Sequence, residues 1–180
     1  MTVFIALYRG INVGGKNSVK MESLRAMHEQ VGHQQVRSYI QSGNIVFSAQ
    51  GSAEAQKRKL TAEFAKEFGF EAKIVIRDAK HWGEILEQNP YAEMAVREPK
   101  TVHAGLCEGK PSSQGLEALL EKVGGSETFV IGNGVIYLHA PDGFGTSKFA
   151  AGMERACGVP LTARNWRTME AVWKLASESK

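Results

Sequence analysis

The sequence lacks any apolar stretch long enough to cross a bilayer, because no window approaches about 18 consecutive apolar residues. Its N-terminus, Met1–Arg9, has neither a positively charged leader nor a small-residue cleavage site, so we expect it to form a first strand and not a signal peptide. We therefore predict a soluble protein with no membrane partner.

Cysteine is also scarce. Cys107 and Cys157 are the two cysteines, and they do not form a CxxC pair. Two isolated thiols are typical of a reducing compartment, so we expect a cytoplasmic location and two small buried side chains. The five histidines show no ligand spacing. We therefore predict no metal site and no cofactor.

Neither sign of charge dominates the sequence, but the basic residues are unevenly distributed. The net charge is +3 over 180 residues. Residues 1–37 and 147–174 each carry five basic and two acidic side chains, and the remainder is mildly acidic. Two basic segments on such a body indicate a local anionic partner, while the total is too small to require nucleic acid.

The apolar pattern of the first half predicts the order β-α-β-β-α-β. We expect strands at 2–8, 36–40, 44–48 and 72–77, with helices near 20–31 and 53–68. Gln41-Ser42-Gly43-Asn44 is a hairpin signal between the two middle strands. Ser52 is placed to cap the second helix, and Gly69 to end it.

The same order recurs in the second half. We expect strands at 102–107, 127–131, 135–139 and 159–162, with helices around Leu116–Val123 and Phe149–Ala156. A final helix near 165–177 has the apolar stripe Trp166, Met169, Val172 and Trp173, which is typical of a face that packs on a core.

These patterns predict an α+β protein with two tandem ferredoxin-like βαββαβ halves, mostly antiparallel sheets and a C-terminal helix. We place the first half at 1–88 with a short trailing helix at 79–88. The connection lies at 89–100, and the second half at 101–180. The hairpins Tyr39–Phe47 and Phe129–Tyr137 look alike, which is weak support for a duplication.

A Gly-rich loop follows the first strand and reads Gly10-Ile11-Asn12-Val13-Gly14-Gly15-Lys16-Asn17. It matches the glycines and the lysine of the phosphate-binding pattern GxxxxGK[ST], but Asn17 replaces the hydroxyl that would hold Mg²⁺. A later strand ending in aspartate is missing too. Two readings remain open: an anion site lined by backbone N–H groups, and a tight turn that needs positive φ.

Two further clusters lie before helices. In Gly143-Phe144-Gly145-Thr146-Ser147-Lys148, Thr146 or Ser147 is placed as the cap. Lys148 then lies in the first turn, where the helix dipole disfavours a cation by roughly 0.3–1 kcal/mol. Either a bound anion or a side chain that bends into solvent would account for a lysine at this position. The other cluster is Thr162-Ala163-Arg164-Asn165-Trp166-Arg167.

The topology suggests how these clusters relate. In the first half, the Gly-rich loop and the hairpin lie at one end of the sheet. In the second half, residues 145–148 and 164–167 lie at the opposite end. If the halves are related by an approximate two-fold axis, both ends line one cleft. The predicted ligand-binding residues are Arg9, Asn12, Gly14, Gly15, Lys16, Asn17, Ser42, Asn44, Lys148, Arg164 and Asn165.

At these motifs the chain resembles a bacterial family classed as domain of unknown function 1697. The resemblance rests on Arg9–Lys16, Tyr39–Asn44, Ser147-Lys148 and Thr162–Trp166, and it covers nearly the whole chain. It implies a small α+β protein. It implies no activity, substrate or cofactor, and so no catalytic residues.

Three functions remain open. The first is binding of, or catalysis on, a phosphorylated or other anionic small ligand, with Lys16 and Lys148 stabilising charge. The second is a nucleic-acid-binding module, which is less favoured because residues 3–8 are apolar on both faces and the RNA-binding octamer is missing. The third is a structural or oligomerising protein. The sequence does not decide whether the protein is an enzyme, nor its oligomeric state.

Overall fold

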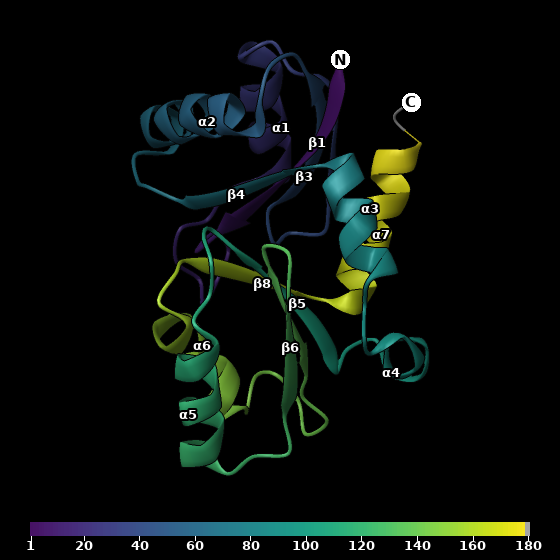
Figure 1. The fold of residues 1–180 in the computed structure, drawn as a ribbon. Coiled ribbons are helices and arrows are strands. Elements are labelled where there is room, and N and C mark those ends of the chain that lie inside the picture. Colours follow the sequence, from purple (N-terminus) through teal and green to yellow (C-terminus); the bar gives the residue numbers. More distant parts are fainter. Residues whose placement is uncertain (179–180) are drawn as a thin grey trace. The chain divides into compact units, whose positions relative to one another are not determined.

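The computed structural model describes residues 1–178, and it shows two sheets with helices packed against them (Figure 1). The elements follow in the order β1 (Thr2–Arg9), α1 (Met21–Gln30), β2 (Gln34–Tyr39), β3 (Asn44–Ala49), α2 (Ala53–Phe68), β4 (Lys73–Asp78), α3 (Ala79–Glu87), α4 (Ala92–Arg97), β5 (Val102–Cys107), α5 (Ser113–Val123), β6 (Thr128–Gly132), β7 (Val135–His139), α6 (Lys148–Cys157), β8 (Leu161–Asn165) and α7 (Trp166–Ser177).

The strand order within each sheet confirms the predicted fold class. One sheet has the order β2-β3-β1-β4 and the other β6-β7-β5-β8, and every neighbouring pair is antiparallel. This is the ferredoxin-like arrangement twice along one chain, followed by the predicted C-terminal helix α7.

Two compact units result. One comprises Met1–Gly83 together with the C-terminal residues from Ala171, and the other comprises Glu84–Glu170. Helix α7 therefore begins in the second unit and ends in the first. The 89–100 connection contains the short helix α4.

Each unit buries one face of its sheet under two helices. In the first unit Leu24 of α1 and Leu60 and Phe64 of α2 pack with Phe4 and Phe47 of the sheet. In the second unit the helices α5 and α6 cover the corresponding face, and this core contains Leu116, Leu138, Phe149, Met153 and Cys157.

Local signals account for most of the helix ends. The Ser52 hydroxyl accepts a hydrogen bond from Ala55 N, and Gly69 ends α2 in the left-handed conformation with φ +74°. Ser112 and Ser147 cap α5 and α6 in the same way, so Ser147 and not Thr146 is the cap of the two that were predicted for α6.

The last strand differs from its predicted position. The sequence pattern indicated residues 159–162, whereas β8 runs from Leu161 to Asn165. Gly158 ends α6 in the left-handed conformation, and Pro160 has no N–H to donate to a strand ladder, so pairing begins only after it. Arg164 and Asn165 consequently belong to the strand and not to the turn before α7.

Candidate functional site

The Gly-rich loop after β1 is held in place by the side chain of Asn12. Asn12 Nδ2 donates to Val19 O at 2.9 Å and to Gln41 O at 2.8 Å, while Oδ1 accepts from Val19 N at 2.8 Å. The amide thus closes the loop on itself and joins it to the β2–β3 hairpin. Asn tolerates the left-handed φ of +54° that this position adopts.

The tip of this loop is a tight turn. Gly14 and Gly15 have φ +59° and +75°, and Lys16 N donates to Val13 O at 3.1 Å across them. Two positive φ angles in succession characterise a type I′ turn. Helix α1 begins only at Met21, so the loop does not lead directly into a helix as a phosphate-binding loop does.

Asn17 closes the base of the turn. Its Nδ2 donates to Gly10 O at 3.0 Å, and its carbonyl accepts from Asn12 N at 3.1 Å. The structure therefore supports the turn reading of the glycines, with the loop held by side-chain hydrogen bonds and its Lys16 side chain exposed.

The hairpin contributes two predicted residues, Ser42 and Asn44. Buried Asn44 donates through Nδ2 to Tyr39 O at 3.1 Å and to Ser42 Oγ at 2.8 Å. Tyr8 N donates to Gly43 O at 2.8 Å. Asn12, Asn17 and Asn44 are thus committed to the backbone of the loop and hairpin, and the exposed charge nearby belongs to Arg9 and Lys16.

A third cation lies beside them that the sequence reasoning missed. The β1–β4 register sets Arg9 directly opposite Lys73, and both side chains are exposed. The sequence pattern that could have located Lys73 is the alternation Lys73-Ile74-Val75-Ile76-Arg77. Ile74 and Ile76 pack in the core, so the two basic residues lie on the opposite face of the sheet.

In the second unit, Lys148 follows the N-cap Ser147 of α6. The Ser147 hydroxyl donates to Glu127 Oε1, and Ser126 Oγ donates to Asp142 Oδ2 at 2.6 Å. Glu127 and Asp142 line the same hollow of about 240 Å³ as Lys148. Two carboxylates of the protein itself therefore share this hollow with the lysine.

Arg164 is partly buried on β8. Its Nη1 donates to Ala163 O at 3.0 Å, and burial lowers the pKa of its guanidinium to about 10. Asn165 is the N-cap of α7, because its Oδ1 accepts from Thr168 N at 2.9 Å.

The first unit also has an arginine bonded to the preceding carbonyl and followed by a helix cap, at residues that the sequence reasoning missed. Arg77 Nη1 donates to Ile76 O at 2.9 Å, and Asp78 Oδ1 accepts from His81 N at 2.7 Å. Each half thus ends its last strand with an arginine and then an Asp or Asn that caps the next helix.

The predicted residues consequently fall into groups within the units. Those of the first half meet at one end of its sheet, around the loop and hairpin. In the second half, the end of β8 lies beside the start of β5, since Asn165 pairs with His103, and Phe144 of the β7–α6 loop stacks on that histidine at 4.1 Å. The single cleft lined by both halves stays a prediction.

Within residues 1–178, no group of three or more His, Cys, Asp or Glu side chains is arranged to hold a metal ion. In the same part of the chain, no helix combines the length and apolarity that a bilayer crossing requires.

Comparison with known proteins agrees with this architecture of two ferredoxin-like halves. The profile of a family described as protein of unknown function (DUF1697) matches residues 1–137. The chain belongs to this family, which confirms the resemblance seen in the sequence.

A solved structure described as the conserved bacterial protein SP0830 from Streptococcus pneumoniae is similar to this chain. It is 26% identical with a TM-score of 0.70, and the match covers 97% of this chain and 98% of that one. No curated protein matches the chain significantly.

Proposed function

We propose that this protein binds a phosphorylated or otherwise anionic small ligand at the basic end of the first unit. The observation that carries the proposal is the β1–β4 register, which sets the exposed Arg9 and Lys73 directly opposite each other. Two cations at directly opposed positions give this end of the sheet a local positive potential, which favours the binding of an anion.

Lys16 adds a third positive charge from the adjoining loop. Its turn is fixed by the hydrogen bonds of Asn12 and Asn17. A rigid loop loses little conformational entropy when a ligand binds, so the affinity gained from each contact is retained. In this proposal the asparagines and glycines shape the site, and the ligand contacts are Arg9, Lys16 and Lys73.

The proposed ligand contacts are confined to the first unit. Catalysis is not part of the proposal, because no general base stands among these residues.

The test is the thermal unfolding midpoint of the protein with inorganic phosphate, sugar phosphates, mononucleotides and a short oligonucleotide. A ligand at 100 times its Kd adds about 2.7 kcal/mol, which raises the midpoint by roughly 5–10 °C at this size. We expect one class of small anion to raise it.

Three charge-removing variants locate the site. Arg9→Gln and Lys16→Gln should each reduce the midpoint shift, whereas Arg58→Gln, an exposed arginine on α2 of the same unit, should not. An equal shift in all three variants, or no shift with any small anion, would refute the proposal. A shift with the oligonucleotide alone, falling steeply with salt, would favour the nucleic-acid-binding module instead.

A further inference from the structure

The two halves can be aligned residue by residue where the first strand meets the hairpin. Leu7 pairs with Asn44 in one sheet, and Leu106 pairs with Val135 in the other. Tyr8 N donates to Gly43 O at 2.8 Å, and Cys107 N donates to Gly134 O at 2.9 Å. Tyr8 therefore corresponds to Cys107, and Gly43 to Gly134.

In the first half, side chains fill the space beside the hairpin. The Tyr8 ring is buried, and Ile11 is only 2% exposed. Ile11 lies so close to the hairpin that a Cβ on Gly43 would be 2.7 Å from Ile11 Cδ1. Asn12 adds its hydrogen bond to Gln41 O.

In the second half, the corresponding space is open. Cys107 has a small thiol in place of the Tyr8 ring. Residues 108–112 alone connect β5 to α5, whereas residues 10–20 connect β1 to α1. Lys110 in this shorter loop is exposed, whereas Ile11 in the longer loop of the first half is buried.

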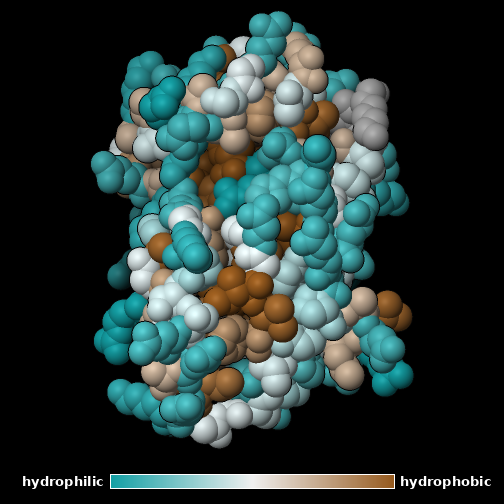
Figure 2. All heavy atoms as spheres, viewed as in Figure 1, coloured by the Kyte–Doolittle hydropathy of each residue, from teal (hydrophilic) through white to brown (hydrophobic). Residues whose placement is uncertain are grey.

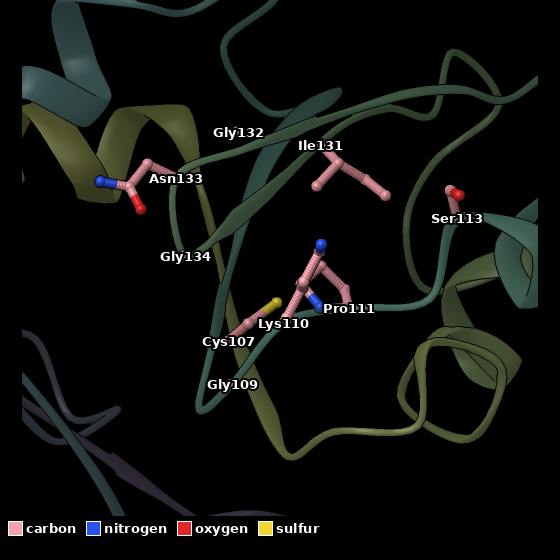
Figure 3. Close-up of a pocket in the computed structure, with 9 residues that line it drawn as sticks. All are labelled: Cys107, Gly109, Lys110, Pro111, Ser113, Ile131, Gly132, Asn133 and Gly134. Atoms are coloured by element: carbon pink, nitrogen blue, oxygen red, sulfur yellow. The ribbon is translucent and has the colours of Figure 1, made fainter.

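A hollow of about 640 Å³ results, which is a common size for a small-molecule site. Its lining residues are Cys107, Gly109, Lys110, Pro111, Ser113, Ile131, Gly132, Asn133 and Gly134. Figure 3 shows the Lys110 side chain rising from the loop toward Ile131 of the hairpin, with Asn133 at the hairpin's tip.

The surface beside the hollow is also apolar. Figure 2 shows an apolar patch over β6, the strand that contributes Ile131. The hollow thus offers mostly apolar walls and one cation, Lys110.

We propose that this hollow binds a small carboxylic acid with an aromatic or branched aliphatic body. The apolar body would occupy the space that Tyr8 and Ile11 fill in the first half. The carboxylate would meet the Lys110 ammonium, and one cation matches one negative charge. The site shares no residue with the basic end of the first unit, so it stands or falls separately from the function proposed above.

The experiment is a two-dimensional ¹⁵N NMR titration of the full chain with benzoate and 3-methylbutanoate. Saturable shifts are expected at residues 107–113 and 131–134. Benzyl alcohol, which has the ring without the charge, should bind there about tenfold more weakly, since it lacks the charge-assisted contact.

Variants decide whether the hollow itself is the site. Cys107→Tyr restores the ring of the first half and should abolish binding of the acids and of the alcohol. Cys107→Leu is a smaller filling for use if the tyrosine prevents folding. Lys110→Met should reduce benzoate affinity to that of benzyl alcohol, while Lys122→Met, an exposed lysine at the end of α5, should change nothing.

Three results would overturn the proposal. These are no saturable shifts with either acid, shifts that map outside the two segments, and benzoate binding that survives Lys110→Met at full strength. None of them bears on the phosphate test at Arg9 and Lys16, so failure of one proposal leaves the other to its own experiment.

Discussion

Buried polar side chains in the first unit form one directional chain of hydrogen bonds. Gln56 Nε2 donates to Gln50 O at 2.6 Å, which orients the amide so that its Oε1 accepts from His33 Nε2 at 2.9 Å. His33 Nδ1 then accepts from His28 Nδ1 at 3.0 Å, and His28 Nε2 accepts from Tyr8 Oη at 2.8 Å. Every donor meets an acceptor only while both histidines are neutral.

The electrostatics of this chain agree with that assignment. Burial, and secondarily the neighbouring His33, lower the pKa of His28 well below its usual range. Burial also lowers the pKa of His33, with Lys59 acting in the same direction against the hydrogen bond to Gln56. Protonating His33 would set its Nδ1–H against the Nδ1–H of His28, and protonating His28 would force the Tyr8 hydroxyl to turn from donor to acceptor, so this core resists charging.

In the second unit, His103 is also a histidine whose pKa is lowered by burial, and it gives a prediction of pH dependence. Its ring stacks on Phe144 at 4.1 Å, and burial lowers its pKa to about 4. A histidine with a lowered native pKa contributes its full stability above about pH 6.5, and that contribution is lost as the pH falls toward 4. The free energy of unfolding should therefore decrease over this range.

Urea unfolding between pH 7 and pH 4 measures this loss. His103→Phe keeps the stacking but removes the titrating ring. The free energy of unfolding of this variant should therefore fall less steeply with pH than that of the parent, and the two slopes should differ by up to ~1.4 kcal/mol per pH unit. His28 and His33 keep a residual slope in the variant. Superimposable pH profiles for the parent and His103→Phe would contradict the prediction.

Residue types alone could not assign roles in the Gly-rich loop. Asn12 and Asn17 were predicted to contact a ligand, because amides near glycines and a lysine are typical of anion sites. In the structure they adopt φ +54° and +52° and donate to loop carbonyls, which stabilises the turn. The sequence shows that an amide is there, but its partner depends on where the hairpin lies.

At the scale of elements, prediction succeeded where both ends of a helix carry a signal. The range of α2, 53–68, was predicted without error because Ser52 and Gly69 mark its ends and Leu60 and Phe64 mark its buried side. Helix α4 was missed because six residues between Pro90 and Pro99 are too few for a periodic pattern to show.

Contact between the loop and the hairpin depends on Gly43, which leads to a prediction with a matched control. Gly43 and Gly69 both have φ +74°, but a Cβ on Gly43 would meet Tyr8 Cβ and Ile11 Cδ1 at 2.7 Å, whereas nothing lies within 4 Å of one on Gly69. Gly69→Ala should cost about 1 kcal/mol for the backbone conformation alone.

Gly43→Ala should cost that amount and roughly 1–3 kcal/mol more, because two packed side chains must move. Denaturant unfolding of both variants measures the difference. Equal losses of stability would mean that the loop and hairpin adjust freely, and this would weaken the case for a rigid loop presenting Lys16.

At the scale of the whole molecule, the duplication is clearer in the structure than in the sequence. Similar apolar hairpins suggested it weakly. The matching arginines Arg77 and Arg164, each bonded to the preceding carbonyl, and the matching caps Asp78 and Asn165 give it a geometric basis. The sequence could not reveal these pairs, because they align only when strand register is known.

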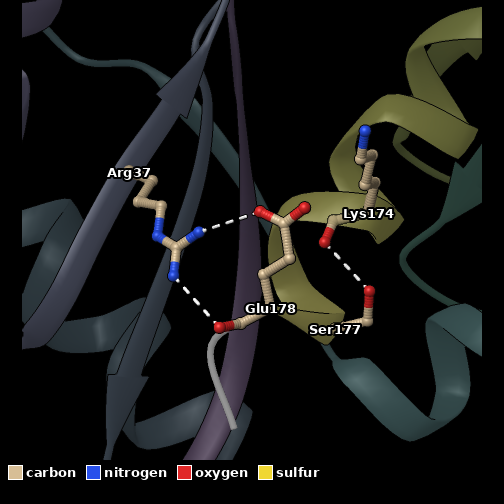
Figure 4. Close-up of polar contacts among 4 residues, drawn as sticks. All are labelled: Arg37, Lys174, Ser177 and Glu178. Carbon is tan, nitrogen blue, oxygen red and sulfur yellow. Dashed lines mark hydrogen bonds and ion pairs between the residues drawn. The ribbon is translucent and has the colours of Figure 1, made fainter.

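The repeat also explains why the end of the chain belongs to the first unit. Helix α7 follows β8 as α3 follows β4, and the two helices pack on each other: a Cβ on Gly83 would lie 2.9 Å from Trp173 Cη2. Val172 and Ala176 are fully buried on the same helix. Beyond it, Arg37 Nη1 and Nη2 donate to Glu178 Oε2 and O, each at 3.3 Å (Figure 4).

These two attachments should differ greatly in strength. The Arg37–Glu178 ion pair is exposed, with 36% and 50% of the side chains accessible, so Glu178→Gln should cost less than about 0.5 kcal/mol. Trp173→Ala removes a large ring packed on α3 and should cost ~2 kcal/mol or more. Hydrogen exchange should then accelerate in the first unit, in α3 and the end of α7, and change little in β5 and β7. If Glu178→Gln were as damaging as Trp173→Ala, the ion pair and not the tryptophan would hold the C-terminus on the first unit.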